Sequence, residues 1–174
     1  MKTILETPRL ILREMTTSDL TAICRVLQDE KTMYAYEHAF SDEEAQAWLN
    51  NQLRRYREDG FGLWAVVLKE SGEIIGQCGI TLQDVNGEWV PEVGYLFERA
   101  YWHRGFATEA AIACKEYAFN VLGLDNVYTI IRDNNISSQN VAKRNGMTIC
   151  GRIVKHYYGM DMPHLVYRAE RDAK

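Results

Sequence analysis

A glycine-containing turn between a strand-like and a helix-like segment is the most informative local pattern in this 174-residue chain. The strand-like segment Glu92–Phe97 leads into the turn Trp102–Gly105, and Ala107–Glu109 then begins a helical pattern. The free N–H groups and the positive dipole end of such a helix start suit a pyrophosphate. Gly105 would let the backbone approach the phosphates closely, and Arg104 would add a positive charge. The same pattern is also typical of an ordinary glycine turn, so alone it does not decide the function.

A second segment, from Asn134 to Met147, combines a strand end, a capped helix and a glycine at the helix end. Asn135 and Ser138 lie near the expected helix start, where amide and hydroxyl side chains satisfy unpaired backbone N–H groups. Gly146 suits the left-handed conformation that ends many helices. Capping alone would explain both polar residues, and ligand binding is the alternative.

Together, the two segments resemble motifs of the GCN5-related N-acetyltransferase (GNAT) family. The residues from Trp102 to Ala110 resemble its acetyl-CoA motif, Gln/Arg-x-x-Gly-x-Gly/Ala, and those from Asn135 to Met147 resemble its following Asn-x-x-Ser motif. The segment Thr7–Arg13, with Asp19–Leu20, is similar to the subgroup of ribosomal-protein N-terminal acetyltransferases. The resemblance spans nearly the whole chain. It implies one domain over residues 1–174 that moves acetyl from acetyl-CoA to a primary amine by direct attack, without a covalent acyl-enzyme.

The resemblance also implies roles for single residues. In the family, the backbone of a splayed strand pairs with the pantetheine arm, and by spacing this role falls on Tyr95, Leu96 and Phe97. The pyrophosphate would lie on the turn and helix start formed by His103, Arg104, Gly105, Phe106, Ala107 and Thr108. Asn135 would hydrogen-bond the pantetheine, with Asn140 as a second candidate. The family places its acceptor beside the loop that holds Tyr36, Glu37 and His38, although an aromatic loop can also simply pack.

The residues that move protons depart from the family pattern. One branch of the family uses a Glu base and a Tyr acid, and the equivalent positions here are Ile130 and Ala142, which cannot transfer protons. Trp102 also replaces the opening Gln or Arg of the acetyl-CoA motif. Glu92 is therefore the candidate base. The alternative roles for Glu92 are a cross-strand salt bridge or a solvated strand end. Ser138 is the candidate acid for the departing thiolate, and helix capping is its alternative role.

Composition limits the alternatives. Hydrophobic residues at 47% and charged residues at 25% are ordinary for a globular domain. The net charge of −4 gives no general attraction for nucleic acid and is compatible with a cationic substrate. We find no apolar run long enough to cross a membrane and no signal-peptide pattern, so we expect a cytoplasmic protein without a membrane partner.

The cysteine pattern indicates neither a disulfide framework nor a zinc site. Cys24, Cys78, Cys114 and Cys150 are widely spaced, and no Cys/His pair has the spacing of zinc ligands. Each lies in an apolar stretch, so we expect four reduced core residues and no metal.

Apolar periodicity predicts the elements that must position these residues. Strands are expected over 9–13, 63–68, 74–82, 90–97, 127–131, 148–155 and 165–168, and helices from about 20 to 27, from the Ser41–Glu44 capping box to about Gly60, over 107–122, and from Ser137 or Ser138 to about Asn145. This order, β-αα-βββ-α-β-α-ββ, predicts an α/β or α+β fold. Its sheet would be mixed and mostly antiparallel, with six or seven strands and about four helices.

The acceptor remains open between two kinds of amine. A protein N-terminal α-amine is favoured, because its pKa of about 8 is lower than the value of about 10.4 for lysine. A small amine, such as a polyamine, aminoglycoside or amino acid, is the alternative within the enzyme class. Because Ile130 and Ala142 lack the family's proton-transfer groups, a catalytically weak acyl-CoA sensor is the alternative outside that class.

Overall fold

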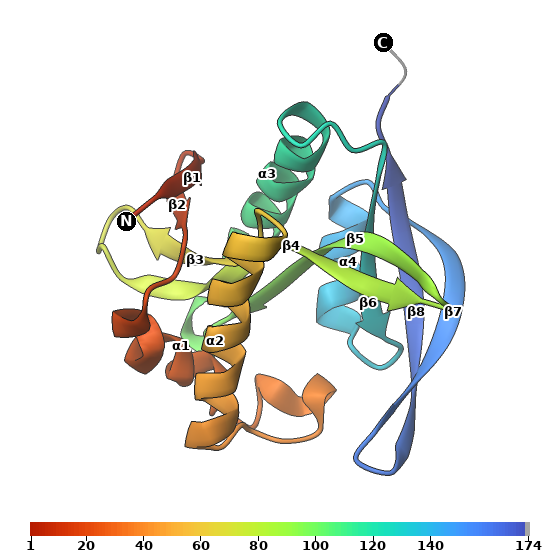
Figure 1. The fold of residues 1–174 in the computed structure, drawn as a ribbon, viewed down its shortest axis with the longest axis horizontal. Coiled ribbons are helices and arrows are strands. Elements are labelled where there is room, and N and C mark those ends of the chain that lie inside the picture. The colour runs from red at the N-terminus through yellow and green to blue at the C-terminus, as the bar shows by residue number, and fades with distance from the viewer. Residues whose placement is uncertain (173–174) are drawn as a thin grey trace.

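The computed structural model describes residues 1–172 and builds them on one eight-stranded sheet (Figure 1). The strands are β1 (Thr3–Glu6), β2 (Leu10–Arg13), β3 (Leu63–Leu68), β4 (Ile74–Val85), β5 (Glu88–Phe97), β6 (Asn126–Arg132), β7 (Thr148–Tyr157) and β8 (Met160–Glu170). Their order across the sheet is β1-β2-β3-β4-β5-β6-β8-β7. Each neighbouring pair within the described residues is antiparallel except β5 and β6, which are parallel. The predicted mixed, mostly antiparallel sheet is confirmed.

Four α-helices of the described chain cover the two faces of the sheet. They are α1 (Leu20–Leu27), α2 (Asp42–Glu58), α3 (Phe106–Asn120) and α4 (Ile136–Arg144). The alternation along β3 shows which helices share a face: Trp64 and Val66 pack in the core with α3 and α4, whereas Leu63 and Ala65 pack with α1 and α2. Since successive side chains of a strand point to opposite faces, α1 and α2 cover one face and α3 and α4 the other.

Helix α3 lies close to the sheet because its buried face is small. Ala110, Ala111, Cys114 and Ala118 are all fully buried against the strands. This small face lets the helix approach the strands closely. It brings the start of α3 next to the end of β5, where the glycine turn joins them.

The structure adds one strand and lengthens others. Strand β1 pairs with β2 through the turn at Thr7–Pro8, so the predicted count of six or seven strands is low. Strand β8 spans Met160–Glu170 and includes Pro163, so it is longer than the strand expected over 165–168. Because β7 is an edge strand with no helix packed over most of it, Cys150 is exposed. The prediction of four core cysteines is wrong for Cys150; Cys24 is half-buried, and Cys78 and Cys114 are buried as expected.

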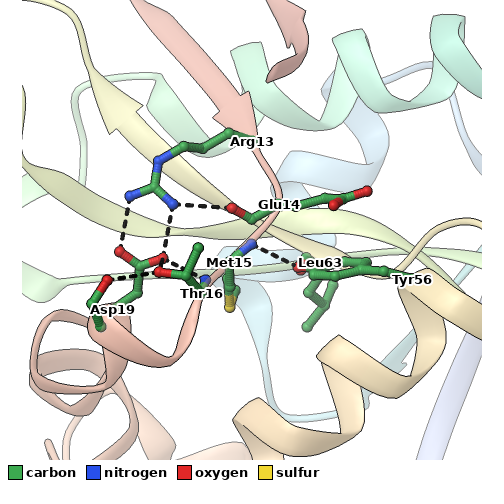
Figure 2. Close-up of polar contacts among 8 residues, drawn as sticks. Arg13, Glu14, Met15, Thr16, Asp19, Tyr56 and Leu63 are labelled. Carbon is green, nitrogen blue, oxygen red and sulfur yellow. Dashed lines mark hydrogen bonds and ion pairs between the residues drawn. The ribbon is translucent and has the colours of Figure 1, made fainter. Parts of the chain in front are cut away.

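A buried ion pair joins the end of β2 to the segment that begins α1 (Figure 2). The Arg13 guanidinium donates to both Asp19 carboxylate oxygens at 2.8 and 2.9 Å, and the Thr16 backbone N–H donates to Asp19 at 2.7 Å. Burial raises the pKa of Asp19, but the hydrogen bonds from Arg13 and Thr16 outweigh it, so the pKa lies below its usual value. Nearby, the Tyr56 hydroxyl accepts from the Met15 N–H and donates to the Leu63 carbonyl, tying α2 to this segment and to β3.

We expect Asp19→Ala to lower the free energy of unfolding by about 3 kcal/mol, because it leaves the Arg13 charge buried without its partner. Glu14→Ala is the control, since the Lys2–Glu14 pair is more exposed and such pairs contribute at most about 1 kcal/mol. The measurement is urea unfolding at neutral pH. Because the folded-state pKa is depressed, the loss should shrink as the pH falls below about 4 and Asp19 becomes protonated. A loss no larger than that of Glu14→Ala would contradict the assignment.

Candidate functional site

The parallel pair β5 and β6 stays together at a single position and then separates. Glu92 is in register with Tyr128, and no further pairing joins the two strands in the described residues. By contrast, β5 pairs with β4 continuously from Glu88 to Phe97. Residues 93–97 are thus held on one side only, and backbone N–H and C=O groups on their other side lack ladder partners.

Side chains replace the missing ladder bonds at the point of separation. The Thr129 hydroxyl of β6 donates to the Val93 carbonyl at 3.0 Å. The Ile130 backbone N–H donates to the Glu92 carboxylate. Further along the gap, the Tyr95 hydroxyl donates to the Ser138 carbonyl of α4 at 2.8 Å. These bonds hold the gap open at a defined width.

Two cavities meet at this gap. The larger, of about 340 Å³, lies among α2, β5, β6 and the β7–β8 hairpin. The smaller, of about 200 Å³, lies among the end of β5, the glycine turn and α4. Both are lined by Thr32, Tyr95, Leu96, Asn135 and Ser138. The two cavities therefore adjoin each other along this shared wall.

The turn before α3 has a strained backbone that its neighbours hold in place. His103 and Gly105 both have positive φ, 60° and 79°, and only glycine adopts that region without cost. The Arg9 guanidinium donates to the Arg104 carbonyl at 3.0 Å and to the Glu109 carboxylate at 2.6 Å. The Trp102 indole N–H donates to the Phe97 carbonyl at 2.9 Å, so this departure from the motif ties the turn to β5.

The smaller cavity brings together nearly all the predicted cofactor-binding residues. It is lined by Tyr95, Leu96, Phe97, His103, Gly105, Phe106, Ala107, Thr108, Asn135 and Asn140. The Arg104 side chain is the exception, because its guanidinium stacks on Phe106 at 5.1 Å and does not line the cavity. Arg144, in the last turn of α4, also lines it and was not among the predicted residues.

Asn135, rather than Ser138, is the N-cap of α4. Its side-chain oxygen accepts from the Ser138 backbone N–H at 3.2 Å and from the Tyr34 hydroxyl at 2.7 Å. The prediction that the helix begins at Ser137 or Ser138 is therefore off by one or two residues. The side chain of Ser138 is not needed as a cap, and the residue lines both cavities.

Glu92 is half-buried in the wall of the larger cavity. Burial raises its pKa to about 7, and the nearby charges of Lys155 and Arg55 only partly oppose the rise. Glu92 lies in the middle of β5, and no cation of the described chain is within ion-pair distance of it. Neither a cross-strand salt bridge nor a solvated strand end describes this position. At neutral pH the carboxyl is poised between its two protonation states.

The predicted acceptor residues separate into two groups. Tyr36 lines the larger cavity, and burial raises the pKa of its hydroxyl well above the usual range. Glu37 and His38 do not line it: Glu37 pairs with Arg132, and His38 Nε2 lies 2.9 Å from Glu44.

Sequence reasoning missed several lining residues of the larger cavity. Trp48, Asn51 and Arg55 recur at helical spacing on one face of α2, which is a signal the sequence contained. Lys155, Tyr157 and Tyr158 come from the β7–β8 hairpin, and only the tertiary fold brings them here.

Within residues 1–172, no group of three or more His, Cys, Asp or Glu side chains is arranged to hold a metal ion. No helix of this part of the chain is both long and apolar enough to cross a membrane.

The chain belongs to the GNAT family, whose acetyltransferase domain model matches residues 9–148. The Bacillus subtilis protein YkkB is 35% identical over 147 residues, covering 84% of this chain and 86% of that protein. The Bacillus subtilis N-acetyltransferase YnaD is 32% identical over 142 residues, covering 81% and 80%. RimL, a ribosomal L7/L12 α-N-protein acetyltransferase solved in complex with coenzyme A, shares the fold with a TM-score of 0.81 at 18% identity, covering 99% and 100%. This chain is therefore an acetyltransferase of the GNAT family, whose members use acetyl-CoA.

We expect Glu92→Gln to stabilise the ligand-free protein, and more so at high pH. A carboxyl whose pKa is raised on folding costs stability once the pH exceeds its unfolded value of about 4.3, and the cost is complete above about 7. Gln keeps an oxygen for the Ile130 N–H and removes the charge. Urea unfolding should show a gain of about 1 kcal/mol near pH 5 and about 3 kcal/mol near pH 8. An equal gain at both pH values would mean that Glu92 does not titrate in this range.

Proposed function

We propose that this enzyme transfers acetyl from acetyl-CoA to a primary amine, with the coenzyme in the smaller cavity and the acceptor in the larger. The observation that carries the proposal is the meeting of the two cavities at the β5–β6 gap, with Glu92 on the acceptor side. All described strands belong to one sheet, which supports a single catalytic domain.

The residues around the smaller cavity suit coenzyme A. Acetyl-CoA supplies the acetyl group as a thioester. The backbone of Tyr95–Phe97, unpaired toward β6, would hold the pantetheine, with Asn135 and Asn140 beside it. The turn His103–Thr108 offers backbone N–H groups at a helix start, and Arg144 adds a positive charge nearby. RimL, which shares this fold, was solved in complex with coenzyme A, and this supports coenzyme A as the ligand.

Glu92 would take the proton that the acceptor ammonium must lose before its nitrogen can attack. With a pKa of about 7, it is a stronger base than an ordinary carboxylate and still partly ionised at neutral pH. Deprotonation at pH 7 costs about 1.4 kcal/mol for an α-amine of pKa about 8 and about 4.6 kcal/mol for lysine. The smaller cost favours an α-amine, such as a protein N-terminus, with another amine of low pKa as the alternative.

Ser138 and the gap itself would complete the transfer. Ser138 lines both cavities, so its hydroxyl can reach the junction where the thiolate must receive a proton. Backbone N–H groups of the splayed strand would stabilise the negative charge that develops on the thioester oxygen. The amine attacks directly, and no covalent acyl-enzyme is needed.

We expect Gly105→Glu to abolish coenzyme A binding, because it places bulk and negative charge where the pyrophosphate must approach. Millimolar coenzyme A should raise the melting temperature of the wild type and leave that of the variant unchanged. Gly123→Glu is the matched control: Gly123 also has a positive φ, 69°, but lines neither cavity. A folded Gly105→Glu variant that keeps the wild-type shift would refute the assigned site.

We expect Glu92→Gln to lower turnover by about 10²-fold at neutral pH, because no other carboxylate lines the larger cavity among the described residues. The defect should weaken toward about pH 9, where an α-amine is already neutral. The measurement is a pH–rate profile of both proteins with one acceptor. A defect of constant size would indicate substrate positioning. Ser138→Ala, profiled alongside, should reduce turnover without this pH dependence.

Coenzyme A binding without thiol release from acetyl-CoA for any amine would favour the sensor alternative.

A further inference from the structure

The larger cavity has more positive than negative charge in its wall. Its charged side chains are Arg55, Glu92, Arg132 and Lys155. Arg132 pairs with Glu37, which lies outside the cavity lining, so its charge is balanced. His164 also lines the cavity, but burial lowers its pKa, which favours the neutral ring. The wall therefore holds two cations without a carboxylate partner in the described chain, Arg55 and Lys155, and one carboxyl, which is itself partly protonated at neutral pH.

Arg55 projects from α2 without a carboxylate partner. No Asp or Glu of residues 1–172 is within ion-pair distance of its guanidinium, whose one hydrogen bond is a long contact of 3.4 Å to the Gln52 side chain. Burial lowers the pKa of Arg55, as expected for a partly desolvated cation. The adjacent Arg54 differs, since it points to solvent and pairs with Glu58. An arginine held half-buried and unpaired is costly until an anion joins it.

Lys155 reaches the same cavity from β7. It is half-buried and has no ion-pair partner in the described chain, whereas its neighbour His156 pairs with Asp161 outside the cavity. Lys155 and Arg55 come from opposite sides of the cavity wall, a helix and a hairpin, and the charges of both act on Glu92. An acceptor that carried only an ammonium group would add a third positive charge to this space.

We infer that the acceptor is an amine with a carboxylate close to the amino group, bound by Arg55 and Lys155 while Glu92 faces the nitrogen. The guanidinium presents a planar pair of N–H donors that matches a carboxylate, and the lysine adds a point charge. This inference rests on the proposed function and names its substrate class. Two sources have this chemistry: a free α-amino acid, and a peptide N-terminus followed by an acidic residue.

The test compares matched acceptors with and without this carboxylate. One pair is a free α-amino acid and its carboxamide; the other is two tetrapeptide amides with Asp or Asn as second residue. We expect thiol release with a kcat/KM at least tenfold higher for the carboxylate member of one pair, and the pair that shows it identifies the source. The carboxamide of an amino acid loses its ammonium proton more readily, so easier deprotonation of the amine cannot explain a preference for the carboxylate.

Variants connect the preference to the two cations. Arg55→Gln and Lys155→Gln should each reduce the preference for the carboxylate acceptor over its neutral partner, measured as the ratio of their kcat/KM values, at least tenfold, with little change in the KM for acetyl-CoA. Arg54→Gln is the matched control and should leave all values unchanged. As a second readout, the carboxylate acceptor should raise the melting temperature of the coenzyme A complex, and this shift should be lost in Arg55→Gln.

The outcomes distinguish a failure of the substrate inference from a failure of the proposed function. If coenzyme A stabilises the protein and amines are acetylated, but neutral members react as well as carboxylates, the inference is wrong and the proposed function stands. A preference that survives in both Arg55→Gln and Lys155→Gln would also overturn it. If coenzyme A gives no stabilisation and no amine releases thiol, the proposed function itself fails.

Discussion

The separation of β5 and β6 immediately after Glu92 is the constraint on which the site depends. A parallel pair that stayed together would fill the gap with its own hydrogen bonds and divide the two cavities. Here β4 holds β5 along its whole length, so β5 can leave β6 without losing its conformation. Thr129 and Glu92 take the bonds that the ladder gives up. Glu92, at the point of separation, therefore links β5 to β6 and is also the one carboxyl that lines the larger cavity within the described chain.

The N-terminal segment braces both halves of this arrangement, although it lines neither cavity. Arg9 holds the turn before α3 through Arg104 and Glu109, on one face of the sheet. Four residues later, Arg13 holds the start of α1 through Asp19, on the other face. Leu10 and Leu12 of β2 pack in the core on the side of α3, so strand alternation places Arg13 on the opposite face. Arg9 precedes the strand, so this alternation does not constrain it.

The sequence predicts what depends on neighbours along the chain. The Ser41–Glu44 capping box and the glycine turn at Gly105 form as expected, because each is decided within a few residues. The larger cavity was predictable only in part. Glu92 and Tyr36 were singled out, but Lys155 arrives through a long hairpin whose second strand contains Pro163. The prediction that Cys150 lies in the core was wrong because an apolar pattern does not tell whether a helix will cover an edge strand.

The charges around Glu92 tie acceptor binding to its basicity. Burial raises the pKa of Glu92, and the positive charges of Lys155 and Arg55 hold the rise to about 7. A carboxylate bound between those two cations would offset their effect on Glu92, and its pKa would rise further. The ammonium of the same molecule, placed beside Glu92, would lower that pKa until its proton is transferred, and would stop doing so once the nitrogen is neutral. An acceptor with both groups therefore leaves Glu92 a stronger base than a simple amine would, and the gain comes at the moment when the proton moves.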